Sequence, residues 1–99
     1  MLDVGTIVRF EWDEDNVRKS ADKHSVSQAE AEQVFFNDPL VGSTDDKHSS
    51  VEQRFHALGQ TDAGRMLHIT YAVKLQGAVI RVISARPMSR KERARYAEI

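Results

Sequence analysis

Basic and hydroxyl-bearing side chains make up the part of this 99-residue sequence that could carry out chemistry. Cleaving RNA without a metal requires a base for the 2′-hydroxyl proton, a cation beside the phosphorus and an acid for the leaving oxygen. Histidine can perform either proton transfer near neutral pH, and the planar guanidinium of arginine fits a phosphate. The candidate set is Lys23, His24, Arg54, His56, Ser84, Arg86, Ser89 and Arg90.

Strand alternation groups four of these side chains in pairs. Arg54 and His56 are two residues apart in one predicted strand, so they share a face, and Ser84 and Arg86 do the same in another. Structural explanations stay open beside the chemical one. His24 suits the C-terminus of a helix, where a cation is favourable. His56 also fits an ordinary exposed strand position, and Arg54 also fits an ion pair with an acidic loop.

The sequence argues against other reaction classes. There is no cysteine, so thiolate metal sites are excluded, and the four histidines have no paired spacing. The five glycines are scattered and form no phosphate-binding loop. No apolar run approaches the roughly 20 residues of a membrane span, and Met1–Val8 is unlike a signal peptide. We therefore expect a cytoplasmic protein with no cofactor, no metal and no contact with a membrane.

Charge is divided unevenly along the chain, although the net charge is only −1. Residues 1–62 hold six basic and thirteen acidic residues, a net charge of −7, whereas residues 63–99 hold eight and two, a net charge of +6. The basic third is either a surface that attracts anions or a solvated face paired with the acidic half of the chain.

Hydrophobic periodicity predicts the order strand, two helices, four strands and helix. Capping boxes at Ser27–Glu30 and Ser89–Glu92 start the second and third helices, and an acid among residues 13–15 caps the first. Strands are expected at 7–12, 40–42, 54–59, 66–74 and 79–86, and helices at 14–24, 27–36 and from 89. Residues 43–50 are typical of a loop, and residues 61–64 of a hairpin turn.

These elements predict one α+β domain over residues 1–99. Short turns require antiparallel pairing, so we expect an antiparallel sheet of about four to five strands, two N-terminal helices packed on it and a short C-terminal helix. Strands 66–74 and 79–86 should pair at the centre. The predicted core is Phe10, Trp12, Val34, Phe35, Phe55, Leu67, Ile69 and Ile83.

The stretch from Val79 to Tyr96 gives one candidate cation a defined position. Arg86 ends a strand before Pro87, which has no N–H for further sheet pairing. A basic helix begins three residues later, so its free N–H groups should lie near the guanidinium. A phosphate there would meet the planar fork of Arg86 and the start of a helix together, with Arg54 approaching across the sheet.

A set of motifs covers nearly the whole chain, from Arg9 to Glu98. The motifs are Phe10-Glu11-Trp12-Asp13, Lys23-His24 followed by Val26-Ser27, Glu30-Ala31, Phe35-Phe36, Asp38-Pro39, Arg54-Phe55 with Ala57-Leu58-Gly59, Gly64-Arg65, and Ile80 to Arg86 with Arg90-Lys91-Glu92-Arg93 and Tyr96. Together, in this order and spacing, they resemble the BrnT-type toxins.

The resemblance implies a ribonuclease toxin of a type II toxin–antitoxin module with a RelE-like fold. It implies a BrnA-type antitoxin with a ribbon-helix-helix DNA-binding domain, a heterotetramer with that antitoxin, and contact with operator DNA only through it. By position, catalytic roles are expected for Lys23, His24, Arg54, Arg86 and Glu92. RNA binding is expected for Arg81, Ser84, Ser89, Arg90 and Arg93.

The chain departs from the family pattern at four positions. Asn16 replaces a usual Lys, Ser20 a usual Asn, Ser25 a usual Gly and Gln28 a usual aromatic residue. Ser25 would be strained if the helix ends there with a positive φ. Residues 1–8 precede the usual start and represent either an upstream initiation or an added strand. Two alternatives stay open: a weakened toxin that chiefly binds its antitoxin, and a nucleic-acid-binding domain with no toxin role.

Overall fold

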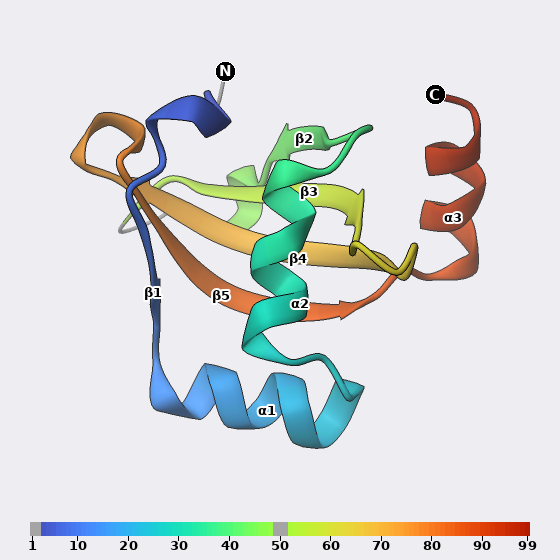
Figure 1. The fold of residues 1–99 in the computed structure, drawn as a ribbon, viewed down its shortest axis with the longest axis horizontal. Coiled ribbons are helices and arrows are strands. Elements are labelled where there is room, and N and C mark those ends of the chain that lie inside the picture. The colour runs from blue at the N-terminus through green and yellow to red at the C-terminus, as the bar shows by residue number, and fades with distance from the viewer. Residues whose placement is uncertain (1–2, 49–51) are drawn as a thin grey trace.

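A five-stranded sheet forms the centre of the protein in a computed structural model that describes residues 3–48 and 52–99. The strand order is β1-β5-β4-β3-β2 (Figure 1). The strands are β1 (Arg9–Trp12), β2 (Val41–Thr44), β3 (Arg54–Gln60), β4 (Met66–Lys74) and β5 (Val79–Pro87). The helices are α1 (Glu14–His24), α2 (Gln28–Gln33) and α3 (Arg90–Ala97), and 3-10 turns cover Val4–Thr6, Val34–Phe36, Asp46–His48 and Leu75–Gly77. None of the described helices is long and apolar enough to cross a membrane.

The predicted α+β class and the central β4–β5 pair are confirmed. One strand differs from the expectation of an antiparallel sheet, because β1 runs parallel to β5 and the sheet is therefore mixed. Short turns force antiparallel pairing on neighbouring strands. β1 is instead separated from β5 by two helices and three strands, so no turn fixes its direction.

β5 also pairs further than predicted. Pro87 lies opposite Leu67, and beyond it the Met88 N–H donates to the Met66 carbonyl at 3.1 Å. The expectation that Pro87 prevents further pairing was wrong. A proline removes only its own N–H, and here the next residue continues the ladder.

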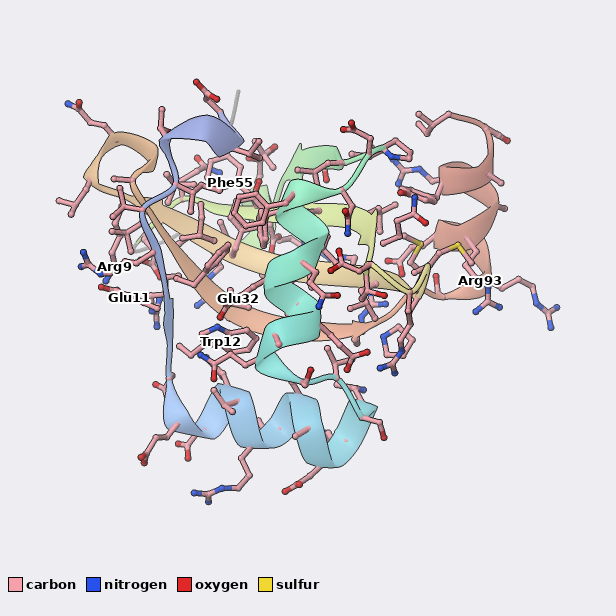
Figure 2. The ribbon with its side chains drawn as sticks, in the orientation of Figure 1. Arg9, Glu11, Trp12, Glu32, Phe55 and Arg93 are labelled. Atoms are coloured by element: carbon pink, nitrogen blue, oxygen red, sulfur yellow. The ribbon has the colours of Figure 1, made fainter. Side chains whose placement is uncertain are left out.

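The hydrophobic core fills the space between the sheet and the two N-terminal helices. Figure 1 shows α2 crossing in front of the sheet, with α1 along the β5 side and α3 beyond the end of β5. Trp12 lies at the rim of this core, where its indole Nε1 donates to the Glu32 carboxylate at 3.0 Å (Figure 2). Of the predicted core, Val34, Phe35, Leu67 and Ile69 are buried, whereas Phe10, Trp12, Phe55 and Ile83 are half-buried.

Ile83 is half-buried because β5 has a β-bulge at this residue. Thr70 pairs with Ser84 and the next residue, Tyr71, pairs with Val82, so Ile83 has no partner on β4. An extra residue reverses the alternation of side chains along the strand. Even-numbered residues before the bulge and odd-numbered residues after it therefore point to the same face of the sheet.

Local capping sets the limits of α1 where the sequence predicts them. Asp13 accepts the Asp15 N–H at 2.9 Å, and the helix ends at Ser25, whose φ of 53° is left-handed. The side of α1 then covers the edge of β5 beyond the point where β1 ends. Ser20 Oγ accepts the Ala85 N–H there at 3.3 Å, which satisfies an edge donor of the sheet.

Arg65 joins α1, α2 and the turn between β3 and β4. Its guanidinium donates to the carbonyls of His24 and Ser25 at 3.1 and 2.7 Å and to the Glu30 carboxylate at 3.1 Å. The last carbonyls of a helix have no partner within the helix, so this side chain satisfies them. The contact fixes the C-terminal end of α1 against the rest of the fold.

Two connecting segments differ from the expectation. β2 extends to Thr44, and a 3-10 turn at Asp46–His48 follows within the segment predicted as a loop; residues 49–50 of that segment lie outside the described residues. Near the N-terminus, Val4–Thr6 forms a 3-10 turn capped by Asp3, so an added strand is absent from the described residues 3–8. The hairpin turn at 61–64 is confirmed, with Gly64 at a φ of 84°.

Candidate active site on the open face of the sheet

The sheet face turned away from α1 and α2, named the open face, carries its side chains in cross-strand rows. Residues that pair across neighbouring strands point to the same face, so the register defines each row. One row runs through Ser43, His56, Thr70 and Ser84, and the next runs through Val41, Leu58, His68 and Arg86.

α3 covers the apolar end of the second row. Leu58 packs with Met88 and Tyr96 in a small core of its own. The Tyr96 hydroxyl donates to the Pro39 carbonyl at 2.6 Å and so ties α3 to the segment before β2. This packing holds the first turn of α3, with Glu92, over the polar end of the row.

A cleft of about 440 Å³ lies between α3 and the open face. Two imidazoles, two guanidiniums, one carboxylate and two hydroxyls face this one space. Convergent polar groups of this kind are what distinguishes a reactive site from a gap in packing. The lining residues are Ser43, His56, Leu58, His68, Thr70, Arg86, Glu92 and Arg95.

Arg86 and Glu92, which both line the cleft, form a two-pronged ion pair. Nη1 and Nη2 of Arg86 donate to the two carboxylate oxygens of Glu92 at 2.8 and 2.9 Å. Glu92 also accepts the Ser89 N–H at 2.8 Å and completes the capping box of α3. Hydrogen bonds from Arg86 lower the pKa of Glu92 to about 2, and the Ser89 N–H adds to this effect. The expected open position for a phosphate, between a free guanidinium and free helix N–H groups, is thus occupied by an internal carboxylate.

His68 is buried behind this ion pair. Its Nε2 lies 3.8 Å from Oε2 of Glu92, and no described residue bonds to its Nδ1. Burial lowers the pKa of His68 to about 4, and the positive charge of Arg86 lowers it further than Glu92 raises it. The imidazole of His68 is therefore neutral at pH 7.

His56 lies beside His68 and is bonded through both ring nitrogens. Nε2 is 3.2 Å from Oδ2 of Asp45, a buried residue that follows β2. Nδ1 is 3.2 Å from the hydroxyl oxygen of Thr70. The ring centroids of His56 and His68 are 4.7 Å apart. Carboxylate, imidazole and hydroxyl thus form one continuous chain.

A third row of the open face adds two guanidiniums. Arg54 and Arg81 both pair with Ala72 of β4. The β-bulge brings Arg81 to the same face as Arg86, although the two are an odd number of residues apart. Arg81 is ion-paired with Glu52 through Nη1. The open face therefore holds three strand-borne arginines on β3 and β5.

The structure brings together only part of the predicted site. His56, Arg86 and Glu92 line the cleft, and Arg54, Arg81 and Ser84 lie on the open face beside it. The others do not line it. Lys23 and His24 close α1, Ser89 caps α3, Arg90 is exposed, and Arg93 donates to the Met88 carbonyl from the outer side of α3 (Figure 2).

Sequence reasoning did not select five polar residues of the cleft region: Ser43, Asp45, His68, Thr70 and Arg95. Counting outward from the predicted hairpin turn would have found two of them. Gln60 pairs with Met66 across that turn, so His56 must meet Thr70 and Leu58 must meet His68. Asp45 and Arg95 had no such signal, because a loop and a separate helix bring them to the cleft.

Within the described residues, no group of three or more His, Cys, Asp or Glu side chains is placed to hold a metal ion.

The fold and the cleft together define a small α+β protein with arginines and histidines gathered on one face of its sheet. Residues 12–92 match the family described as "Ribonuclease toxin, BrnT, of type II toxin-antitoxin system". The chain belongs to this BrnT family of ribonuclease toxins, which confirms the resemblance seen in the sequence.

A solved structure with the same fold is the 1.1 Å crystal structure of the Brucella abortus ribonuclease toxin BrnT. The TM-score is 0.58 over 84% of this chain and 99% of that chain, at 18% sequence identity. At this identity the similarity shows the fold alone. No curated protein matches the chain.

Proposed function

We propose that this chain is an endoribonuclease that cleaves RNA with its own side chains and needs no metal. The observation that carries the proposal is the set of guanidiniums at Arg54, Arg81 and Arg86 beside a histidine-lined cleft. A phosphorane bears more negative charge than the bound phosphate, so preorganised cations stabilise it more than the ground state. The family to which the chain belongs supports RNA as the substrate.

Arg86 is the proposed principal contact of the phosphate. In the resting protein Glu92 holds the guanidinium of Arg86 in one orientation. An RNA phosphate competes with the Glu92 carboxylate for the same two N–H donors of Arg86. Arg54, Arg81 and Ser84 then contact the neighbouring phosphates along the open face. The remaining predicted residues contact the RNA outside the cleft: Lys23, His24, Ser89, Arg90 and Arg93.

Cleavage of a labelled RNA by the purified protein in excess EDTA tests this proposal. We expect cleavage to persist in EDTA, and Arg86→Lys to lower the rate on the order of a hundredfold, because an ammonium cannot form the two-pronged contact. Arg18→Lys is the matched control. Arg18 is exposed on α1, on the opposite side of the sheet from the open face, so the rate should not change.

Three outcomes would contradict parts of the proposal. Restoration of activity by magnesium or zinc after EDTA would refute the metal-free reaction. Full activity of both Arg86→Lys and Arg86→Ala would refute the role of Arg86. Absence of cleavage with intact antitoxin binding would support a second candidate, a weakened toxin that serves as a binding module. The observation that favours this candidate is the carboxylate of Glu92 in the fork of Arg86.

We also propose that the partner is a BrnA-type antitoxin, in the cytoplasm where the RNA is found. Acidic and apolar residues of the antitoxin would cover the basic surface formed by Arg86, Arg90 and Arg93. Its own ribbon-helix-helix domain would bind operator DNA and join two toxins in a heterotetramer.

Co-expression with the neighbouring reading frame, followed by mass determination of the complex, tests the assembly. Affinity should fall with salt because charge pairs contribute to it. A complex that leaves all three arginines open to solvent would contradict this proposal.

A further inference from the structure

The hydrogen bonds around His56 determine which of its ring nitrogens carries the proton. Asp45 offers Nε2 a carboxylate oxygen at 3.2 Å, and an ionised carboxylate only accepts hydrogen bonds. Nε2 of the neutral ring therefore carries the proton, and Nδ1 holds a lone pair. The Thr70 hydroxyl, 3.2 Å away, donates to that lone pair. None of these three residues belongs to the arginine set that the proposed function uses.

This arrangement meets the requirements of a general base. A base needs a lone pair directed at a hydroxyl and a partner that stabilises the charged form after proton transfer. Thr70 Oγ1 occupies the position at Nδ1 that an attacking hydroxyl of a substrate would take. Asp45 is only 8% exposed, so little solvent screens its attraction for an imidazolium.

His68 adds a second condition. Its ring is 4.7 Å from that of His56, and burial keeps the pKa of His68 at about 4. A neutral His68 does not repel a positive charge on its neighbour, so a proton transferred to His56 meets no second imidazolium in the cleft. Among residues 3–48 and 52–99, the charged and titratable groups that face the pair are Asp45 after β2, Arg54 on β3, Arg86 on β5, and Glu92 and Arg95 on α3.

We propose that His56 is the general base of RNA cleavage in this protein and that Asp45 is its positioning residue. The inference rests on the proposed ribonuclease function and deepens it. His56 Nδ1 takes the proton of the 2′-hydroxyl while the 2′-oxygen bonds to phosphorus. The bond from phosphorus to the 5′-oxygen breaks, the leaving oxygen takes a proton from water, and His56 later returns its proton to solvent. The products are a 2′,3′-cyclic phosphate and a 5′-hydroxyl.

The rate of RNA cleavage as a function of pH tests the role of His56. We expect the plot of wild-type rate against pH to have one rising limb, along which the imidazole loses its proton. His56→Gln should lose this limb and cleave on the order of a hundredfold more slowly, with an unchanged melting temperature as the check on folding. A His56→Gln variant that cleaves at the wild-type rate would overturn the inference while leaving the proposed function intact.

Asp45→Asn tests the positioning role. The new amide can donate to Nε2 and so favours the tautomer with the proton on Nδ1, which should lower the maximal rate by about tenfold or more. Asp62→Asn is the matched control. Asp62 lies in the exposed turn between β3 and β4 and accepts from Asn37, so the rate should stay unchanged.

Nitrogen-15 NMR of the His56 ring gives a readout that needs no RNA. We expect the wild-type protein at alkaline pH to carry its proton on Nε2, and Asp45→Asn to shift the proton toward Nδ1. A wild-type ring with its proton on Nδ1 would overturn the inference whatever the cleavage assay gives. Absence of cleavage by the wild type would instead overturn the proposed function, and the base role with it, even where the tautomer is the expected one.

Discussion

The two faces of β4 are almost equally buried and chemically opposite. Leu67 and Ile69 have no exposed surface, while His68 and Thr70, which alternate with them, are 7% and 9% exposed. The first pair is covered by apolar residues of α2 and its 3-10 turn, among them Phe35. The second pair faces α3, whose one buried residue is Tyr96. Burial alone therefore does not separate core from site; the chemistry of the covering element does.

The two faces also act oppositely on stability. Each large apolar side chain buried on the helix-covered face contributes about 1.5–3 kcal/mol. On the open face, Nδ1 of His68 has no partner among the described residues, and a buried polar group without one costs about 1–3 kcal/mol. Residues that oppose folding in this way are typical of functional positions. The favourable burial of the core therefore offsets the free-energy cost of the unpartnered polar group in the cleft.

The largest effect is expected from Leu67→Ala on the helix-covered face. Leu67 is completely buried in the main core, so the cavity should lower the free energy of unfolding by about 2–5 kcal/mol. Leu58→Ala on the open face should cost less, because Leu58 lies in a small cluster with two other buried residues. Urea denaturation measures both. A larger loss for Leu58→Ala would break the comparison of the two faces.

Glu92→Gln should cost about 1–2 kcal/mol at pH 7, discounted for the partial exposure of the ion pair. Arg86 lowers the pKa of Glu92 from 4.5 to about 2, so the stabilisation is complete above pH 4.5 and is lost as the pH falls toward 2. Denaturation between pH 2 and 7 should show this loss in the wild type and a flatter profile in the variant. Glu98→Gln, at the exposed end of α3, is the control and should keep the wild-type profile.

His68→Val should raise stability by about 1 kcal/mol at pH 5, because it makes the open face resemble the covered one. Burial lowers the pKa of His68 from 6.5 to about 4, so the unfolded chain binds a proton below pH 6.5 that the folded chain binds only near pH 4. Wild-type stability therefore falls as the pH drops from 6.5 to 4. Unfolding curves of the wild type and of His68→Val at pH 5 and pH 8 check this. The prediction is contradicted if the free energy of unfolding changes by the same amount between the two pH values in both proteins.

Ser25→Gly is expected to give the smallest change, a gain of roughly 0.5–1 kcal/mol. Ser25 ends α1 at a φ of 53°, which glycine adopts without a steric penalty. The melting temperature should rise, and Ser25→Ala, which keeps the Cβ atom, should not share the gain. Equal melting temperatures for the glycine and alanine variants would show that the helix end carries no strain.

How much of the cleft could be predicted depends on how local its determinants are. Arg54 and Arg86 belong to strands that the sequence predicts well, and both lie on the open face. The pairing of Glu92 with Arg86 could not be predicted from the sequence. Ser89 and Glu92 define a capping box in sequence, but only the packing of α3 on Leu58 places that same carboxylate in the guanidinium fork.

The sequence by itself determined the helix caps at Ser27 and Ser89, a cap for α1 among residues 13–15, the hairpin turn ending at Gly64 and the extent of β4. These features follow from hydrogen bonds and backbone preferences within a few residues, so local chemistry specifies them. The tertiary structure decided the parallel pairing of β1, the bulge at Ile83 and the meeting of Asp45 with His56. Each of these depends on the register of segments distant in sequence, and a single-residue shift of register moves every side chain of a strand to its other face.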